Sequence, residues 1–100
     1  MENIFSVNKI SSPQGIIVVI VDLELKGKVI ENEKLIIDLS KEFYKGEDML
    51  QKDLLELLNK AYIVNFTGEK SIDFGMKLNL VHENNIIKID DIPHAETYLG

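Results

Sequence analysis

Apolar and polar residues alternate through the first part of the chain, which is the pattern of half-buried β-strands. Residues 3–10 alternate in this way, and residues 16–23 are dense in β-branched side chains, which favours a buried central strand. Residues 11–15, Ser-Ser-Pro-Gln-Gly, hold proline and glycine in turn-forming places, so we expect the two strands to form a hairpin. Further along, residues 28–32 and 35–39 predict two short strands or one bent strand.

The period of the pattern changes after Gly46. Apolar residues then recur at helical spacing with polar residues between them, at Leu50, Leu54, Leu57, Leu58 and Ala61. We therefore predict an amphipathic helix over residues 47–60, about four turns long.

The second half of the chain predicts three more strands around one ambiguous segment. Residues 61–66 and 86–89 are short apolar runs, and residues 94–99 form a final strand. We expect this last strand at the edge of the sheet, because Pro93 at its start cannot donate to a neighbour. Residues 69–80 alternate strictly, which favours a strand after a hairpin turn. As a helix, the same residues place apolar stripes on nearly opposite sides, which requires burial on both.

Length and composition narrow the class of protein. One hundred residues make one domain, 1–100, and a hydrophobic content of 45% makes it globular. No apolar run approaches the roughly 18 residues of a membrane helix, and the start of the chain lacks the features of a signal peptide. There is no cysteine, so disulfides, thiol catalysis and cysteine metal sites are excluded. We expect a cytoplasmic protein with no membrane partner.

The charged residues bear on the choice of partner. The net charge is -6, and all eleven basic residues are lysines. Specific readers of nucleic acids favour arginine for its bidentate contacts, and they carry a basic face. The lysines here are interleaved with acids, as in Lys41-Glu42 and Glu69-Lys70. The sequence therefore argues against direct nucleic-acid binding and favours a protein partner or one small anion.

The order of these pieces resembles a known family. The residues that carry the likeness are Gly68-Glu69, the segment 78–87 (Leu-Asn-Leu-Val-His-Glu-Asn-Asn-Ile-Ile) and Pro93-His94-Ala95. Over nearly the whole chain they are similar to small archaeal proteins catalogued as a domain of unknown function, number four-two-four. The resemblance implies a compact α+β domain without an assigned activity, and a helix over residues 69–80. This sequence departs from the family at Phe74-Gly75, where Ala- and Leu-like residues are typical.

The first candidate site is Thr67, Gly68, Glu69 and Lys70. If a helix begins here, Thr67 is a plausible cap, and the free amides of residues 68–71 can meet an anion. The segment holds one glycine, so it matches neither the phosphate loop nor the dinucleotide fingerprint. Glu69 also places a negative charge in the first turn of such a helix, and this charge repels a phosphate. A structural turn is the simpler interpretation.

The second candidate is His94, because a proline turn would fix its ring and a histidine pKa ordinarily lies near neutrality. General acid–base catalysis needs a partner and a cleft, and the sequence indicates neither. His82 and His94 with nearby carboxylates are conceivable metal ligands, but their spacing matches no known pattern. We therefore predict no catalytic residues, no metal site and no cofactor, and we leave enzymatic activity open while favouring its absence.

Some side chains are candidates for contact with a partner protein. Phe43, Tyr44 and Tyr98 are possible anchors, although burial of Phe43 under the helix and of Tyr44 at the core edge is the simpler interpretation. The acidic residues in 31–33 and 90–91 are either solvated turns or contacts for a basic patch of a partner.

These observations predict an α+β fold, with a mixed, mostly antiparallel sheet and the helices 47–60 and 69–80 on one face. Two hypotheses for function follow. The first is a non-enzymatic interaction module of the archaeal cytoplasm, serving translation or RNA–protein assembly through a protein contact; its link to translation is associational. The second is a small-anion or nucleotide-ligand domain, with or without enzymatic activity, built on the 67–70 turn with His94. The second hypothesis requires the 67–70 turn and His94 to converge on a concave pocket, and the first does not. The final strand can also pair between two copies of the chain, so a homodimer is a further alternative.

Overall fold

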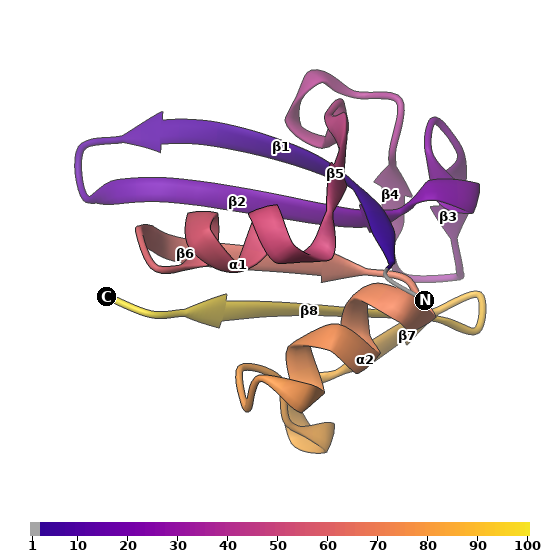
Figure 1. Ribbon diagram of the computed structural model, residues 1–100. Helices are drawn as coiled ribbons and strands as arrows, with labels where there is room; N and C mark the ends of the chain where they lie inside the picture. The colour runs from indigo at the N-terminus through magenta and orange to yellow at the C-terminus, as the bar shows by residue number, and fades with distance from the viewer. Residues whose placement is uncertain (1–2) are drawn as a thin grey trace.

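The strands form where the β-branched residues gather. The computed structural model describes residues 3–100 (Figure 1). Among these residues the strands are β1 (Ile4–Ser12), β2 (Gly15–Asp22), β3 (Val29–Glu31), β4 (Ile36–Asp38), β5 (Glu47–Leu50), β6 (Ala61–Thr67), β7 (Ile87–Ile89) and β8 (Ile92–Tyr98). The α-helices are α1 (Gln51–Leu58) and α2 (Glu69–Lys77), and the short 3-10 turns are η1 (Leu23–Leu25), η2 (Glu42–Tyr44) and η3 (Glu83–Asn85). Every predicted strand is present.

Six strands form one sheet in the order β5-β1-β2-β6-β8-β7, and β3 pairs with β4 as a separate hairpin. β1 and β2 form the predicted antiparallel hairpin, with Ser12 opposite Gly15. β2 and β6 run parallel, which requires a crossover, and the chain between them supplies one through β5 and α1. The other neighbouring pairs in this sheet are antiparallel. The predicted α+β class and the mixed, mostly antiparallel sheet are confirmed.

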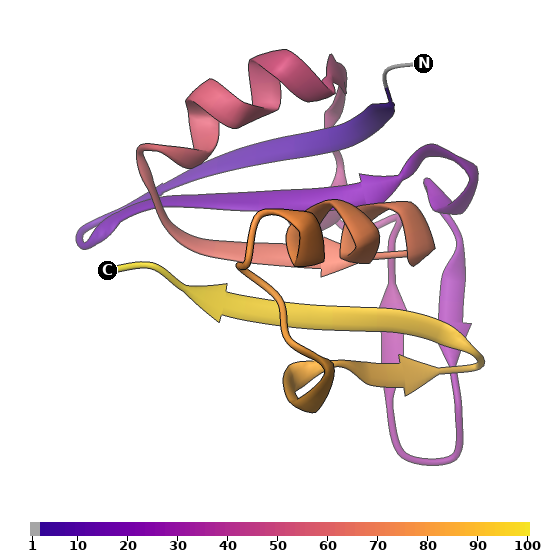
Figure 2. The same ribbon diagram turned by 60° about the horizontal axis from the view of Figure 1, so that its bottom comes forward.

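Both faces of the sheet are covered. Val18 and Ile20 of β2 belong to a core shared with α1 and α2, whereas Val19 and Val21 belong to a second core with Ile30 and other residues of the β3–β4 region. Figures 1 and 2 show the two helices on one side of the sheet and the β3–β4 hairpin on the other. We call these the helix face and the hairpin face. The helices were predicted on one face, but the second layer was not.

The predicted helix over residues 47–60 begins too early, and this part of the prediction was wrong. Glu47–Leu50 form β5, which pairs with the first residues of β1, and α1 starts only at Gln51. The N–H of Gln51 still donates to the carbonyl of Asn3, at 3.0 Å. Leu50 has helical spacing from Leu54, but pairing with the start of the chain decides its conformation.

Residues 69–80 form a helix over most of their length, as the family resemblance implies and against the period of two. The helix ends at Lys77, and Asn79 takes a left-handed φ of 60°. Ile72 and Phe74, which lie on different stripes, are both buried. Together with Ser71 and Gly75 they form one broad buried face, whereas the rest of α2 (Glu69, Lys70, Asp73, Met76 and Lys77) is exposed, so the strict alternation does not reflect the burial of the helix.

The last strand is not at the edge of the sheet, so that prediction was wrong as well. β8 lies between β6 and β7. The carbonyl of Pro93 accepts the N–H of Gly68 (2.9 Å), so the missing Pro93 N–H faces the Gly68 carbonyl. That carbonyl already accepts the N–H of Ile72 at 3.0 Å, as part of α2. An interior strand tolerates this proline because its neighbour has turned into a helix.

At Gly75, we predict that substitution by alanine lowers stability, although helix propensity alone predicts that it raises stability. A β-carbon there would lie 2.6 Å from Val81 Cγ2 and 2.9 Å from Phe66 Cε2. Gly75→Ala gains about 1 kcal/mol of helix propensity but overpacks the core at a cost of about 1–3 kcal/mol. We expect a lower free energy of unfolding in urea, and Asp73→Ala on the exposed side of α2 serves as the control. A more stable Gly75→Ala would show that the helix does not pack this tightly.

Candidate functional site

The predicted site segment lies at the carboxyl ends of the two parallel strands. Thr67 is the last residue of β6, Gly68 is the N-cap of α2, and Glu69 opens the first turn of the helix. Because β2 runs parallel to β6, with Val21 beside Thr67, the end of β2 reaches the same place. The residue found there is Asp22, which the sequence did not single out.

The Asp22 carboxylate occupies the start of α2. Its Oδ2 accepts the N–H of Lys70 (3.0 Å), and its Oδ1 accepts the N–H (2.8 Å) and the hydroxyl (2.7 Å) of Ser71. Asp22 is 3% exposed. Of the four amides expected to be free, those of Gly68, Lys70 and Ser71 are therefore bonded, the first to the carbonyl of Pro93. The position that suits a phosphate holds a carboxylate of the chain itself.

Gly68 makes room for this carboxylate. Its φ is 111°, and a β-carbon at this position would overlap the carboxylate of Asp22. Thr67, predicted as the helix cap, is instead fully buried in the sheet, where it pairs with His94. Thr67 Oγ1 and His94 Nδ1 share a hydrogen bond of 2.8 Å. The predicted cap was wrong because β6 continues through Thr67.

His94 and the start of α2 lie on opposite faces of the sheet. Phe66 and Ala95 belong to the helix-face core, so their chain neighbours Thr67 and His94 point to the hairpin face. Burial lowers the pKa of His94 below its ordinary value of 6.5, and the charge of Glu96 partly opposes this. The 67–70 turn and the His94 ring therefore do not converge on one pocket. Anion binding by this pair stays a prediction, and the geometry disfavours it.

A small pocket of about 220 Å³ does open beside the start of α2. Its charged lining residues are four carboxylates and one lysine: Asp22, Glu24, Glu69, Asp91 and Lys70. The ammonium of Lys70 lies 3.6 Å from the carboxylate of Glu24, so the lysine is already paired. The remaining negative charge repels a phosphate, which agrees with the filled amides.

The conceivable metal ligands remain separate. Among residues 3–100, no three His, Asp or Glu side chains lie close enough to hold a metal ion. His82 is exposed at the start of η3, where its N–H donates to Asn85 Oδ1 at 2.7 Å.

The candidate aromatic anchors lie away from this pocket. The rings of Phe43 and Tyr44 stack edge to face at 4.9 Å in η2, with Tyr44 against the second core and Phe43 exposed. Phe43 therefore does not pack under a helix, as the simpler interpretation held. Tyr98 is exposed, and its ring lies 6.4 Å from that of Tyr62.

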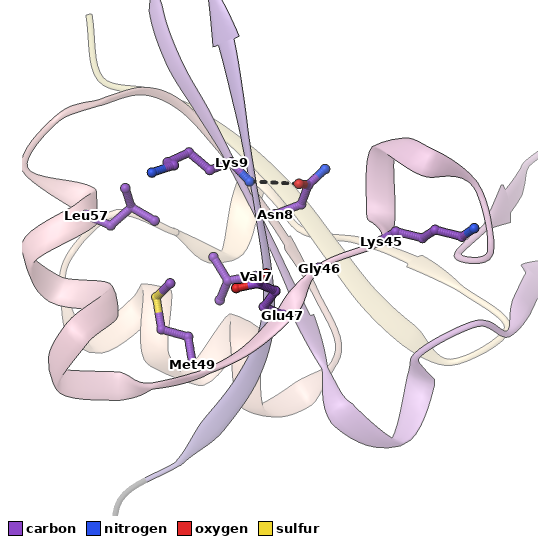
Figure 3. A pocket seen from close by; sticks show the side chains of 8 residues that line it. All are labelled: Val7, Asn8, Lys9, Lys45, Gly46, Glu47, Met49 and Leu57. Carbon is purple, nitrogen blue, oxygen red and sulfur yellow. Dashed lines mark hydrogen bonds between the residues drawn. The ribbon is translucent and has the colours of Figure 1, made fainter.

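A larger concavity, of about 590 Å³, lies between β1, β5 and α1 (Figure 3). We call it the β1 groove; it is lined by Val7, Asn8, Lys9, Lys45, Gly46, Glu47, Met49 and Leu57. In Figure 3, Val7, Met49 and Leu57 lie on one side of the β1 backbone, and Lys45 lies on the other. Three separate segments build this groove, so no local pattern in the sequence indicated it.

Comparison with known proteins gives the family and the fold. Residues 10–99 match the sequence profile described as Protein of unknown function (DUF424). The chain belongs to this family. A solved structure, "Crystal structure of an uncharacterized conserved protein from Methanopyrus kandleri", superposes on the DUF424 chain with a TM-score of 0.78 at 19% sequence identity. The match covers 96% of this chain and 91% of that one, and at this identity it shows the fold alone. No curated protein matches.

The family resemblance is thus confirmed. Within residues 3–100 of this DUF424 protein, neither helix has the length and apolar character needed to cross a membrane.

The burial of His94 predicts a pH dependence of stability. Because its pKa is lowered in the folded state, the unfolded chain binds the proton more readily, and the free energy of unfolding falls as pH drops below 6.5. We compare urea midpoints at about pH 7.5 and about pH 5. His94→Gln should reduce the difference between them, whereas His82→Gln, at an exposed position, should not. An unchanged difference in His94→Gln would contradict the burial of a neutral ring.

Proposed function

We propose that this DUF424 protein is a non-enzymatic interaction module whose protein partner binds the outer face of the β3–β4 hairpin. The observation that carries the proposal is a group of exposed apolar side chains on this hairpin. Ile36 is 68% exposed and Val29 is 56% exposed. Single exposed apolar residues are ordinary, but a group of them on one element is typical of a contact surface.

The pairing of the hairpin explains why these side chains face outward. Ile30 lies opposite Ile37, and both pack toward the second core. Side chains alternate along a strand, so the residues next to them face away from the sheet. The outward residues are Val29, Glu31, Ile36 and Asp38, which we call the hairpin patch.

The hairpin patch combines two apolar side chains with two carboxylates. Val29 stands opposite Asp38, and Glu31 stands opposite Ile36. Hydrogen bonds from the hydroxyl and the N–H of Ser40 lower the pKa of Asp38, so this carboxylate stays charged. Basic residues are absent from the four outward positions. A complementary partner presents apolar side chains with lysine or arginine beside them.

This partner chemistry supports a role next to RNA without contact to it. Proteins that bind nucleic-acid backbones carry basic segments. A chain of net charge -6 suits contact with such a segment better than contact with phosphate. We therefore propose that the module acts in translation or RNA–protein assembly in the archaeal cytoplasm, through a basic protein of the complex.

Gradient sedimentation of native lysate tests this proposal. The tagged wild-type chain should migrate with ribosomal subunits or another large particle at low salt, and less so at high salt, because charge contributes to the contact. Ile36→Ser and Glu31→Lys should shift the chain to the top of the gradient. Leu55→Ser and Glu56→Lys make the same changes on the exposed side of α1 and should not.

Two outcomes would count against the proposal. A wild-type chain that stays at the top at both salt concentrations has no large partner in the lysate. An Ile36→Ser chain that migrates like the wild type does not use the hairpin patch.

A further inference from the structure

The β3–β4 hairpin leaves one end of the hairpin face of the sheet without a second layer. Figures 1 and 2 show the hairpin where β2 and β6 finish, away from the β1–β2 turn. Toward that turn, strand pairing places Ile10, Ile17 and Ile63 side by side on β1, β2 and β6. All three side chains are half-buried, and Tyr98 of β8, which is 68% exposed, pairs with Ile63. We call these three residues the isoleucine row; it forms an apolar floor that ends at Tyr98.

Two polar side chains lie beside this floor on the same face. Asn65 of β6 pairs with Glu96 of β8, and both alternate with residues of the helix-face core, so they point to the hairpin face. Asn65 is 3% exposed, and within residues 3–100 its side-chain amide makes no hydrogen bond. Buried amides are ordinarily bonded, so this one has an acceptor oxygen to offer to a ligand.

Glu96 is an exposed carboxylate without a compensating cation. Among residues 3–100, no ion pair joins it to a lysine. The two lysines that flank η2 are engaged elsewhere, since Lys45 pairs with Glu42 at 3.4 Å and the charge of Lys41 acts on Asp38. The negative charge of Glu96 is therefore available to a positive group from outside the chain.

The other ionisable groups near Glu96 are neutral at neutral pH. Hydrogen bonding to the Glu96 carboxylate raises the pKa of Tyr98. Burial, and to a smaller extent the charge of Glu96, raises the pKa of Tyr44 in η2. Burial lowers the pKa of His94. Two neutral phenol rings thus accompany one carboxylate, and aromatic ring faces attract organic cations.

We propose that this surface binds an arginine side chain of a partner protein, with its methylene stem on the isoleucine row and its guanidinium at Glu96. Arginine suits the site because its stem covers apolar surface while its head stays charged. A planar guanidinium pairs with a carboxylate through two hydrogen bonds and stacks on a ring such as that of Tyr98. A further N–H can donate to the side-chain oxygen of Asn65.

The occupant is another protein rather than a second copy of this chain, because all eleven basic residues of the chain are lysines. A lysine ammonium is a compact charge that cannot pair in two places and stack at once. The site is separate from the hairpin patch, and the inference does not depend on that patch.

Selection from a displayed library of random twelve-residue peptides tests the inference. The enriched peptides should contain arginine next to apolar residues, and their binding should weaken at high salt. Glu96→Gln keeps the size of the side chain and removes its charge, so we expect peptide binding to weaken at least about tenfold. Glu56→Gln makes the same change on the exposed side of α1 and should leave binding within about twofold.

Two further comparisons test the role of the ring and the choice of arginine. Tyr98→Leu removes the ring face and should weaken binding about two- to fivefold, whereas Tyr98→Phe keeps the ring face and should weaken it less. Replacement of arginine by lysine in an enriched peptide should weaken binding to the wild-type protein and change little in Glu96→Gln.

Several results would overturn the inference. They are a selection without enrichment of arginine, equal binding of the arginine and lysine peptides, and equal binding to wild type and to a Glu96→Gln variant with an unchanged circular dichroism spectrum. Ile36→Ser separates the two proposals, since it should not affect peptides bound at Glu96. Peptides lost with Ile36→Ser and kept with Glu96→Gln would support the hairpin patch and exclude the arginine site.

Discussion

The contact between the Asp22 carboxylate and the start of α2 is the constraint on which the arrangement of this protein depends. It joins the end of β2 to the first turn of a helix far along the chain, with Lys70 and Ser71 as donors. Each buried donor left without an acceptor would cost about 1–3 kcal/mol, so the carboxylate holds α2 firmly on the helix face. Gly68 must be a glycine because the carboxylate fills the space of its β-carbon. The same contact places a negative charge where a bound anion would otherwise lie.

Much of the fold could be predicted because local patterns and tertiary contacts agree there. The β1–β2 hairpin has its turn residues and its β-branched run, and both are read from neighbouring residues. The prediction fails where a contact with a residue distant in the sequence determines the local conformation. Leu50 pairs with Ile4 in spite of its helical spacing, and Pro93 sits in an interior strand because Gly68 turns away. Alternation misled over 69–80 because one broad buried face of α2 takes both Ile72 and Phe74, while Met76 is exposed and Leu78 and Leu80 lie beyond the helix.

The candidate site was harder to predict than the fold, because its contacts join residues that are far apart in the sequence. The 67–70 segment was correctly seen as a turn into a helix, but the residue that fills it, Asp22, is 48 or 49 positions away from its partners. An acidic residue that ends an apolar run was the available signal, and it is too common to interpret alone. Thr67 and His94 do meet, through the pairing of β6 with β8, but on the face opposite to the helix amides. Their hydrogen bond belongs to the core of the hairpin face.

The crossover between the parallel strands β2 and β6 supplies the hairpin patch and two of the walls of the β1 groove. The hairpin patch lies on β3 and β4, and the β1 groove is bounded by β5 and α1.

Titration of the wild-type protein with inorganic phosphate and with a nucleotide, followed by the amide chemical shifts of residues 68–71, tests the role of Asp22 most directly. If Asp22 fills the start of α2, these shifts should change no more than those of exposed amides elsewhere, such as on α1. A saturable change confined to residues 68–71 would contradict this role and return the 67–70 turn to the position of a ligand site.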